Sequence, residues 1–209
     1  MMRPGSEYAI ATDALKKYPG FTADIKAARE EARKLLKEAG QEKLKFKLTT
    51  RNVEQPFSPV AIFLINEWRQ IGLQIENEPL DVSQQKARYL AGNFEVGLDA
   101  NTYEADEPND QLLIYLSVDK SPVAFAHYTD RDLDALYDKQ KRVADKAERV
   151  TLIRQFEDKV LQESRMVPVI WWHRIVAHSP ALQGWHVLPS HYVNQDLAGV
   201  WLDPTQLKR

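Results

Sequence analysis

The sequence of 209 residues contains no cysteine, and this absence excludes disulfide bonds, thiolate metal sites and cysteine nucleophiles. It has only eight glycines and none of them cluster, so it carries no glycine-rich phosphate loop. The nucleophile motif G-x-S-x-G and the metal-binding motif H-E-x-x-H are also missing. From these absences we predict neither a cofactor nor a metal site.

The chain also lacks an excess of either charge, because 28 basic residues face 30 acidic ones and the formal net charge is −2. Nucleic acids and anionic membranes need a concentrated basic face, so we expect neither as a partner. No apolar run approaches the roughly 18 residues that span a membrane, and we expect no membrane insertion. The start, MMRPGSEYAIATD, has no apolar stretch typical of a secretory signal. We therefore expect a cytosolic chain or a signal that lies upstream.

Hydrophobic residues make up 44% of the sequence, which is enough for a core, and their spacing predicts an α/β fold. Strand, helix, strand, helix and strand follow one another from residue 43 to residue 110. A strand, a crossover helix and a further strand form a parallel unit. Ser58 followed by Pro59 predicts the start of one helix. The expected elements are a helix over 23–39, a strand over 44–49, a helix over 58–71, a strand with Leu73 and Ile75 inward, a helix over 83–91 and a strand over 94–98.

The second half of the chain predicts two long helices, over 130–143 and 145–164, after a loop region with one short helix near 110–116. The apolar stripe of the second long helix would pack on the sheet. A strongly apolar strand over 167–173 follows, and the last thirty residues are rich in loops. Trp171 and Trp172 face opposite sides of this strand. We expect both rings in the core, with a cleft-lining role for one as the alternative.

Charged and aromatic side chains follow two strands of the predicted sheet. Ligands of open α/β sheets bind beyond the carboxyl ends of the strands. Arg51 follows the first strand, and its guanidinium can bind a carboxylate through two hydrogen bonds. Tyr103 and Asp106 follow the third strand, where Asp106 would meet a cationic ligand group and Tyr103 would pack against the ligand body. With Trp172 as a cleft-lining side chain, these are the predicted ligand-binding residues.

Two alternatives remain open for these residues. The acidic loop is also typical of a solvated surface. Arg51 is equally well explained as the partner of a structural ion pair with one of the nearby acids, which are Asp99, Glu104, Asp106, Glu107 and Asp110.

Two other classes of function compete with ligand binding. An enzyme would use Asp106 or Asp110 in the acidic loop over 104–110 together with a histidine. The histidine pairs 173/178 and 186/191 are five residues apart, which would place the two members of each pair on opposite faces of a strand and argues against a shared metal site. An interaction module would need an exposed apolar stripe on the helices over 130–164. We predict that the chain is not an enzyme.

An ordered set of segments resembles a known family. EARKLLKEAG, a strand that ends in TTR, PFSPVAIFLINEWRQIGLQIE and FEVGLDANTYEADEPND follow one another. In this order they resemble the family 5 extracellular solute-binding proteins, which are the dipeptide-, oligopeptide- and nickel-binding components of ABC importers. Later stretches, from HYTDRDLDALYDKQ to VPVIWW and from GWHVLPSHY to VWLD, resemble the same family. The resemblance covers nearly the whole chain, and its order is more specific than any single motif.

The resemblance implies a periplasmic-binding-protein-like type II lobe, with a mixed sheet flanked by helices and a loop-rich C-terminal tail. Residues 1–178 would form the second of two lobes, and 179–209 would return toward the first. Family members are typically more than twice as long, so the resemblance implies a fragment. It also implies a periplasmic or extracellular location, an ABC permease as partner, and a peptide or similar small solute bound between the lobes.

The resemblance also assigns roles to single residues. Arg51 falls where peptide-binding members carry an arginine after the strand. Asp106 falls where they carry the aspartate of Trp-x-x-Asp, which pairs with the amino group of the peptide. Tyr103 replaces the tryptophan, and the downstream Asp-Pro is here Glu107-Pro108. A lobe alone offers half of the ligand contacts, so we expect weak affinity, and we expect its uncovered face to favour self-association.

Overall fold

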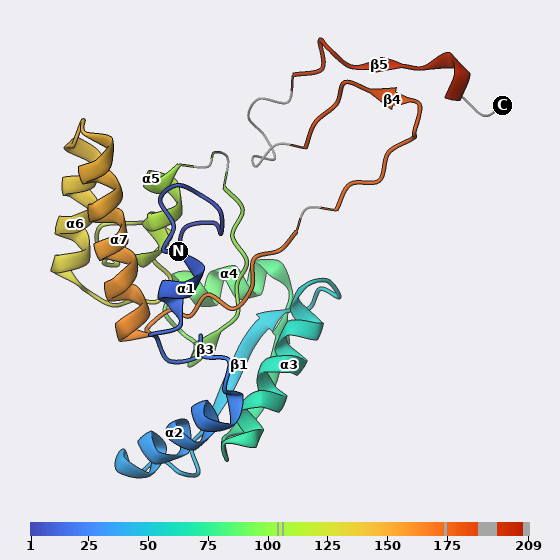
Figure 1. The fold of residues 1–209 in the computed structure, drawn as a ribbon. Coiled ribbons are helices and arrows are strands. Elements are labelled where there is room, and N and C mark those ends of the chain that lie inside the picture. Colours follow the sequence, from blue (N-terminus) through green and yellow to red (C-terminus); the bar gives the residue numbers. More distant parts are fainter. Residues whose placement is uncertain (104, 106, 174, 188–195, 207–209) are drawn as a thin grey trace.

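The computed structural model describes residues 1–103, 105, 107–173, 175–187 and 196–206. A three-stranded sheet with its helices, a group of helices, and a C-terminal extension follow one another along the chain (Figure 1). The short helix α1 (Thr12–Leu15) and the longer α2 (Ile25–Glu38) precede the sheet. The side chain of Asp24 caps α2 by accepting a hydrogen bond from the N–H of Ala27.

The sheet is parallel and has the order β2-β1-β3. Strand β1 (Lys45–Arg51) lies in the middle, with β2 (Gln74–Leu80) and β3 (Val96–Gly97) at its sides. Helix α3 (Phe57–Gln70) connects β1 to β2, and α4 (Val82–Leu90) connects β2 to β3. The predicted order of strands and helices over this segment is confirmed. Because all three strands are parallel, their carboxyl ends meet at one edge of the sheet.

Helix α3 packs against the sheet and encloses a first apolar core. Leu48 from β1 and Ile65 from α3 are both buried in it. Leu73 and Ile75 are buried as predicted. The other face of β1 carries exposed lysines. The predicted cap at Ser58 is wrong, because α3 begins at Phe57 after Pro56.

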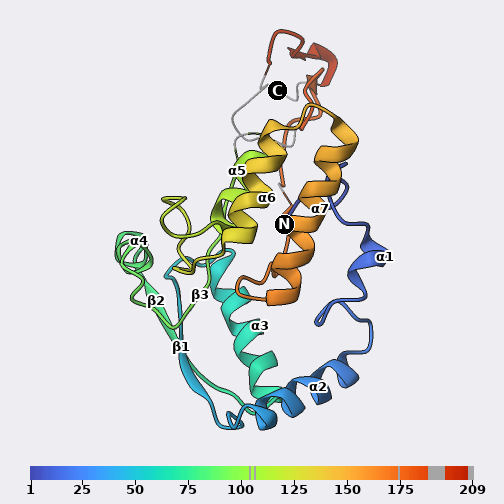
Figure 2. The ribbon, with the colours of Figure 1, turned by 90° about the vertical axis from the view of Figure 1, so that its left-hand side faces the viewer.

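A second apolar core lies among the helices α5 (Pro108–Leu112), α6 (Arg131–Arg142) and α7 (Lys146–Glu163). Figure 2 shows α6 and α7 side by side. Phe156 and Ile153 of α7 are buried against residues of α5, α6 and the 3-10 turn Leu113–Tyr115. The expectation that this stripe docks on the sheet is wrong, because the apolar run after the acidic loop supplies a nearer partner. The stripe is buried, so it does not present the exposed surface that an interaction module would need.

The segment over 167–173 is not a strand, which corrects the prediction. Pro168 lacks a backbone donor, and the segment joins neither described sheet. Trp171 and Trp172 are 40% and 55% exposed, so the expectation that both lie in the core is also wrong.

The C-terminal extension is rich in loops, as predicted. It contains the antiparallel pair β4 (Leu182–Gln183) and β5 (Trp201–Leu202), followed by the 3-10 turn Pro204–Gln206. Parallel and antiparallel pairing are thus found in two separate sheets, and the extension runs away from the rest of the chain (Figure 1). None of the described helices has the length and apolar character needed to cross a membrane.

Candidate functional site

The carboxyl ends of β1 and β3 bring a cation and a carboxylate together. Arg51 is the last residue of β1, and Asp99 follows β3 after one intervening residue. The guanidinium Nη2 of Arg51 donates a hydrogen bond of 2.6 Å to Oδ1 of Asp99. The ring of Phe57, at the start of α3, lies 4.9 Å from the guanidinium carbon. The edge of the sheet where ligands of this fold class bind therefore carries a charged pair.

Helix α4 holds this edge together through two side chains one turn apart. Gln85 accepts a hydrogen bond of 2.7 Å from Nε of Arg51 and donates one of 3.0 Å to the carbonyl of Leu98. Its Nε2 also donates to the hydroxyl of Tyr89, and that hydroxyl donates to the carbonyl of Thr49 at 2.8 Å. Gln85 is only 1% exposed. The end of β1 and the end of β3 are thereby fastened to the same helix face.

Burial raises the pKa of two acidic groups that follow β3. It raises the pKa of Asp99, although the charge of Arg51 acts in the opposite direction. It also raises the pKa of Tyr103 to about 12, and the negative charge of Asp99 adds to this effect. Tyr103 therefore keeps its proton near neutral pH and lies close enough to Asp99 to be affected by its charge.

Three of the four predicted ligand-binding residues lie in the part of the chain that the structure describes. Arg51 forms the structural ion pair that was the alternative explanation, and Tyr103 is affected by the charge of its partner Asp99. Trp172 is exposed in the extended segment after α7. Asp106 lies outside the described residues.

Sequence reasoning missed the roles of Gln85 and Tyr89. Both belong to α4 and are its buried side chains. Their spacing of four residues places them one helical turn apart on one face, which is the signal that could have found them.

The acidic loop forms structural contacts where it is described. The carboxylate of Glu107 caps α5 and pairs with Arg149 of α7. Glu104 lies outside the described residues. His127 contacts the backbone carbonyl of Tyr89 at 2.8 Å. Within the described ranges, no hydrogen bond joins a histidine to this loop, and no three His, Asp or Glu side chains are placed to hold a metal.

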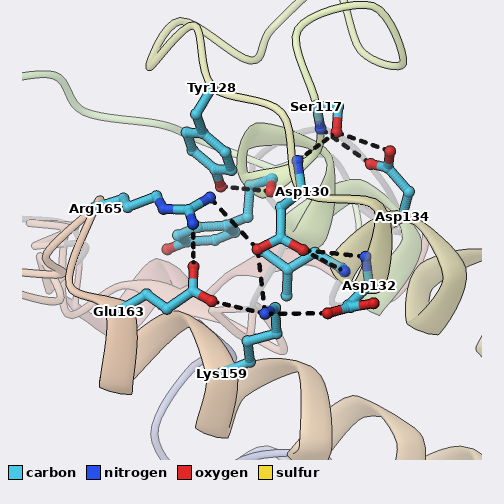
Figure 3. A network of polar contacts seen from close by, with 10 residues as sticks. Ser117, Tyr128, Asp130, Asp132, Asp134, Lys159, Glu163 and Arg165 are labelled. Carbon is cyan, nitrogen blue, oxygen red and sulfur yellow. Dashed lines mark hydrogen bonds and ion pairs between the residues drawn. The ribbon is translucent and has the colours of Figure 1, made fainter.

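A second polar cluster joins α6 to α7 (Figure 3). Asp130 caps α6 by accepting from the N–H groups of Asp132 and Leu133, at 3.1 and 3.0 Å. Its other oxygen lies 3.3 Å from Nζ of Lys159 and 3.4 Å from Nη1 of Arg165. Burial by itself would raise the pKa of Asp130. The hydrogen bonds from the backbone N–H of Leu133 and from Lys159 outweigh this effect, so the pKa lies below its ordinary value. Every charged side chain in this cluster has a partner of opposite charge, which is typical of a cluster that stabilises the packing of two helices.

Comparison with known proteins identifies the family. The model of "Bacterial extracellular solute-binding proteins, family 5 Middle" matches residues 4–122, which is more than half of the chain. The chain belongs to this family of solute-binding proteins. The family predicted from the order of the sequence segments is therefore confirmed.

Curated members of the family resemble the chain at moderate identity. Di/tripeptide-binding protein 4 of Pseudomonas aeruginosa is 28% identical over 166 residues, which cover 77% of this chain and 31% of that protein. Glutathione-binding protein GsiB of Escherichia coli strain K12 is 27% identical over 169 residues, which cover 76% and 33%. The chain thus spans about a third of the length of these solute-binding relatives.

Solved structures agree with the predicted fold. The periplasmic binding protein DppA from Helicobacter pylori, in complex with the peptide STSA, matches with a TM-score of 0.69 and 20% identity. The match covers 94% of this chain and 42% of DppA. OppA from Burkholderia pseudomallei matches with a TM-score of 0.62 and 24% identity, over 72% and 30%. The periplasmic-binding-protein-like α/β lobe expected from the sequence is confirmed.

Proposed function

We propose that this chain is the ligand-binding lobe of an ABC-importer solute receptor, and that its ligand is a short peptide or a similar small solute. The observation that carries this proposal is the half-buried pair of Arg51 and Asp99 at the carboxyl-terminal edge of the sheet. A peptide carries one group of each charge, so an edge with both charges suits it. The relatives named for di/tripeptides and for glutathione support this choice of ligand class.

Each predicted ligand-binding residue has a role in the proposal. Arg51 meets the carboxylate of the ligand, and Asp106 meets its amino group. Tyr103 lies against the body of the ligand as a neutral hydrogen-bonding ring. Trp172, on the exposed segment after α7, lines the cleft and contacts the ligand. The site does no chemistry on its ligand, and the chain acts as a binding protein rather than an enzyme.

In the proposed mechanism the ligand bridges two lobes and shifts a hinge equilibrium toward the closed state. Residues 1–178 form one lobe, and 179–209 lead toward the other. The closed receptor delivers its ligand to an ABC permease in the periplasm or at the cell exterior. One lobe makes only part of the contacts, so this chain alone binds a dipeptide with a dissociation constant on the order of millimolar, which is about −4 kcal/mol.

The test is a titration of the 15N-labelled chain with dialanine and with glutathione, followed by NMR. We expect the largest shift changes at Arg51 and at the residues that follow β3, and Arg51→Gln should abolish them. Arg33→Gln is the matched control, because Arg33 lies on α2 and donates to the carbonyl of Gln70 at the end of α3, whereas Arg51 lies beside Phe57 at the start of that helix. Shift changes that survive Arg51→Gln would contradict the site. Micromolar or tighter binding would contradict the expectation for a single lobe.

A further inference from the structure

Asp99 forms an ion pair with the same guanidinium group that is proposed to bind the carboxylate of the ligand. We propose that Asp99 is an exchangeable counter-ion, whose place at Nη2 of Arg51 is taken by the ligand's carboxylate while Gln85 keeps the guanidinium in position. This inference rests on the proposed function and names the competitor that a carboxylate ligand must displace there. It makes Asp99 a residue that determines specificity rather than a passive structural partner.

The geometry of the guanidinium limits where a carboxylate can approach. Arg has two edges that present parallel N–H groups, one formed by Nε and Nη2 and one by Nη1 and Nη2. Nε of Arg51 is already bound to Gln85 at 2.7 Å, so the first edge is closed. Among the described residues, no hydrogen-bond partner of Nη1 is found. A carboxylate that binds through two hydrogen bonds must therefore use the second edge, where it would share Nη2 with the like-charged carboxylate of Asp99, which lies 2.6 Å from that nitrogen.

The two partners of Arg51 differ in how firmly they are held. Gln85 is 1% exposed and is fixed by further hydrogen bonds to Tyr89 and to the carbonyl of Leu98. The side chains of Asp99 and Arg51 are 18% and 28% exposed, so solvent reaches their contact. Displacement of Gln85 would break a buried network, whereas displacement of Asp99 exchanges one carboxylate for another. The exchange therefore occurs at Asp99.

Displacement of Asp99 is nevertheless unfavourable. Burial raises the pKa of the Asp99 carboxyl, and the positive charge of Arg51 is the main influence against this effect. A displaced Asp99 loses that compensation while it is still partly buried. The free energy needed to separate Asp99 from Arg51 weakens ligand binding in the wild type. It is absent once the charge of Asp99 is removed. Asp99 therefore weakens the binding of a lone carboxylate and favours ligands that make additional contacts.

The probes for the test are N-acetylglycine, which has a carboxylate and no amine, and glycinamide, which has an amine and no carboxylate. The readout is the 1H–15N resonance of the Nε–H group of Arg51. We expect Asp99→Asn to bind N-acetylglycine about fivefold to tenfold more tightly than the wild type, because a charge-assisted competitor has been removed. Asp99→Ser should shift affinity in the same direction, and glycinamide should not bind more tightly to either variant.

Glu78→Gln is the matched control. Glu78 is also a partly buried carboxylate of the sheet, but it pairs with Arg88 and accepts from the hydroxyl of Thr49. Its substitution should leave the affinity for N-acetylglycine unchanged. Equal or weaker binding in both Asp99 variants, together with loss of the backbone amide shift changes after β3 in Arg51→Gln, would overturn the exchange and leave the proposed site standing. Absence of any Arg51 response in the wild type and in the Asp99 variants would overturn both.

Discussion

Gly97 lies where β3 passes under the ring of Tyr89, and the contact leaves no room for a side chain. A Cβ at this position would come within 2.8 Å of both the hydroxyl oxygen and the ring of Tyr89. The hydroxyl of Tyr89 is bonded to the carbonyl of Thr49, and its ring lies 4.7 Å from that of Phe94. The ring therefore cannot move aside without breaking the fastening of the sheet edge to α4. The absence of a side chain at Gly97 therefore allows β3 to lie this close to α4 at the candidate site.

We expect Gly97→Ala to lower the free energy of unfolding by about 2 kcal/mol, because an added methyl group in a packed contact forces its neighbours to shift. Urea unfolding measures this change. Gly199→Ala is the control, since nothing lies within 4 Å of the corresponding Cβ, and its effect should stay within about 0.5 kcal/mol. Equal stability of the two variants would show that Tyr89 does not restrict this position.

At the scale of elements, the polar cluster around Asp130 joins the start of α6 to the end of α7. Lys159 of α7 contacts Asp130 and also Glu163, at 2.6 Å. The hydrogen bond to Glu163 is the main reason why the pKa of Lys159 rises to about 12. Apolar contacts alone hold two helices together, but they do not set the position of one along the other as sharply. We infer that this cluster sets the relative position of the two helices.

Asp130→Asn tests the charge of the cluster without removing the helix cap, because both capping N–H groups bond to Oδ1. At pH 7 we expect a loss of about 2 kcal/mol in the free energy of unfolding, since two cations lose a buried partner. The pKa of Asp130 is lower in the folded chain than its ordinary value. The stabilisation is therefore complete above pH of about 4 and disappears as the pH falls through the lower, folded pKa.

Unfolding measured as a function of pH gives the difference between wild type and Asp130→Asn. That difference should be constant near neutral pH and should shrink in acid. Asp130→Ala provides the comparison, because it also removes the cap and should cost about 1 kcal/mol more at every pH. A difference that does not change in acid would contradict a charge-based role.

The spacing of apolar residues predicted most of the helices and strands, but it also predicted one strand that does not form. The helices around Leu35, Ile65 and Phe156 were predictable because apolar residues recur every three or four positions, and this local pattern sets the helix. The segment over 167–173 is apolar in the manner of a buried strand, yet it forms none. A strand needs a partner that local sequence does not specify, and within the described residues this segment has none.

At the scale of the whole molecule, the apolar segment that follows α7 is uncovered. Its exposed residues are Val167, Val169, Ile170, Trp171, Trp172, Ile175 and Val176. Extended apolar backbone without a strand partner is prone to pair with another chain. We therefore keep the prediction of self-association and assign it to this segment, with Ile175, at 87% exposure, as its most exposed apolar side chain.

Sedimentation velocity over a series of protein concentrations tests this prediction. We expect a reversible shift toward dimers or larger species as the concentration rises, and Ile175→Asp should weaken it at least severalfold. Ile62→Asp is the control, because Ile62 is also exposed but lies on α3. A monomer at every attainable concentration would contradict the prediction, as would an association that only Ile62→Asp removes.

The sequence by itself determined the α/β class, the order of strands and helices, and the edge at which Arg51 lies. These features depend on local periodicity and on the rule that parallel strands end together. It did not determine the partners of Arg51. Asp99 lies 48 residues and Gln85 34 residues from Arg51 along the chain, and only the packing of α4 on the sheet brings the three side chains together. Tertiary structure also left the segment after α7 uncovered, because the partner of an apolar strand is a long-range choice that no local pattern encodes.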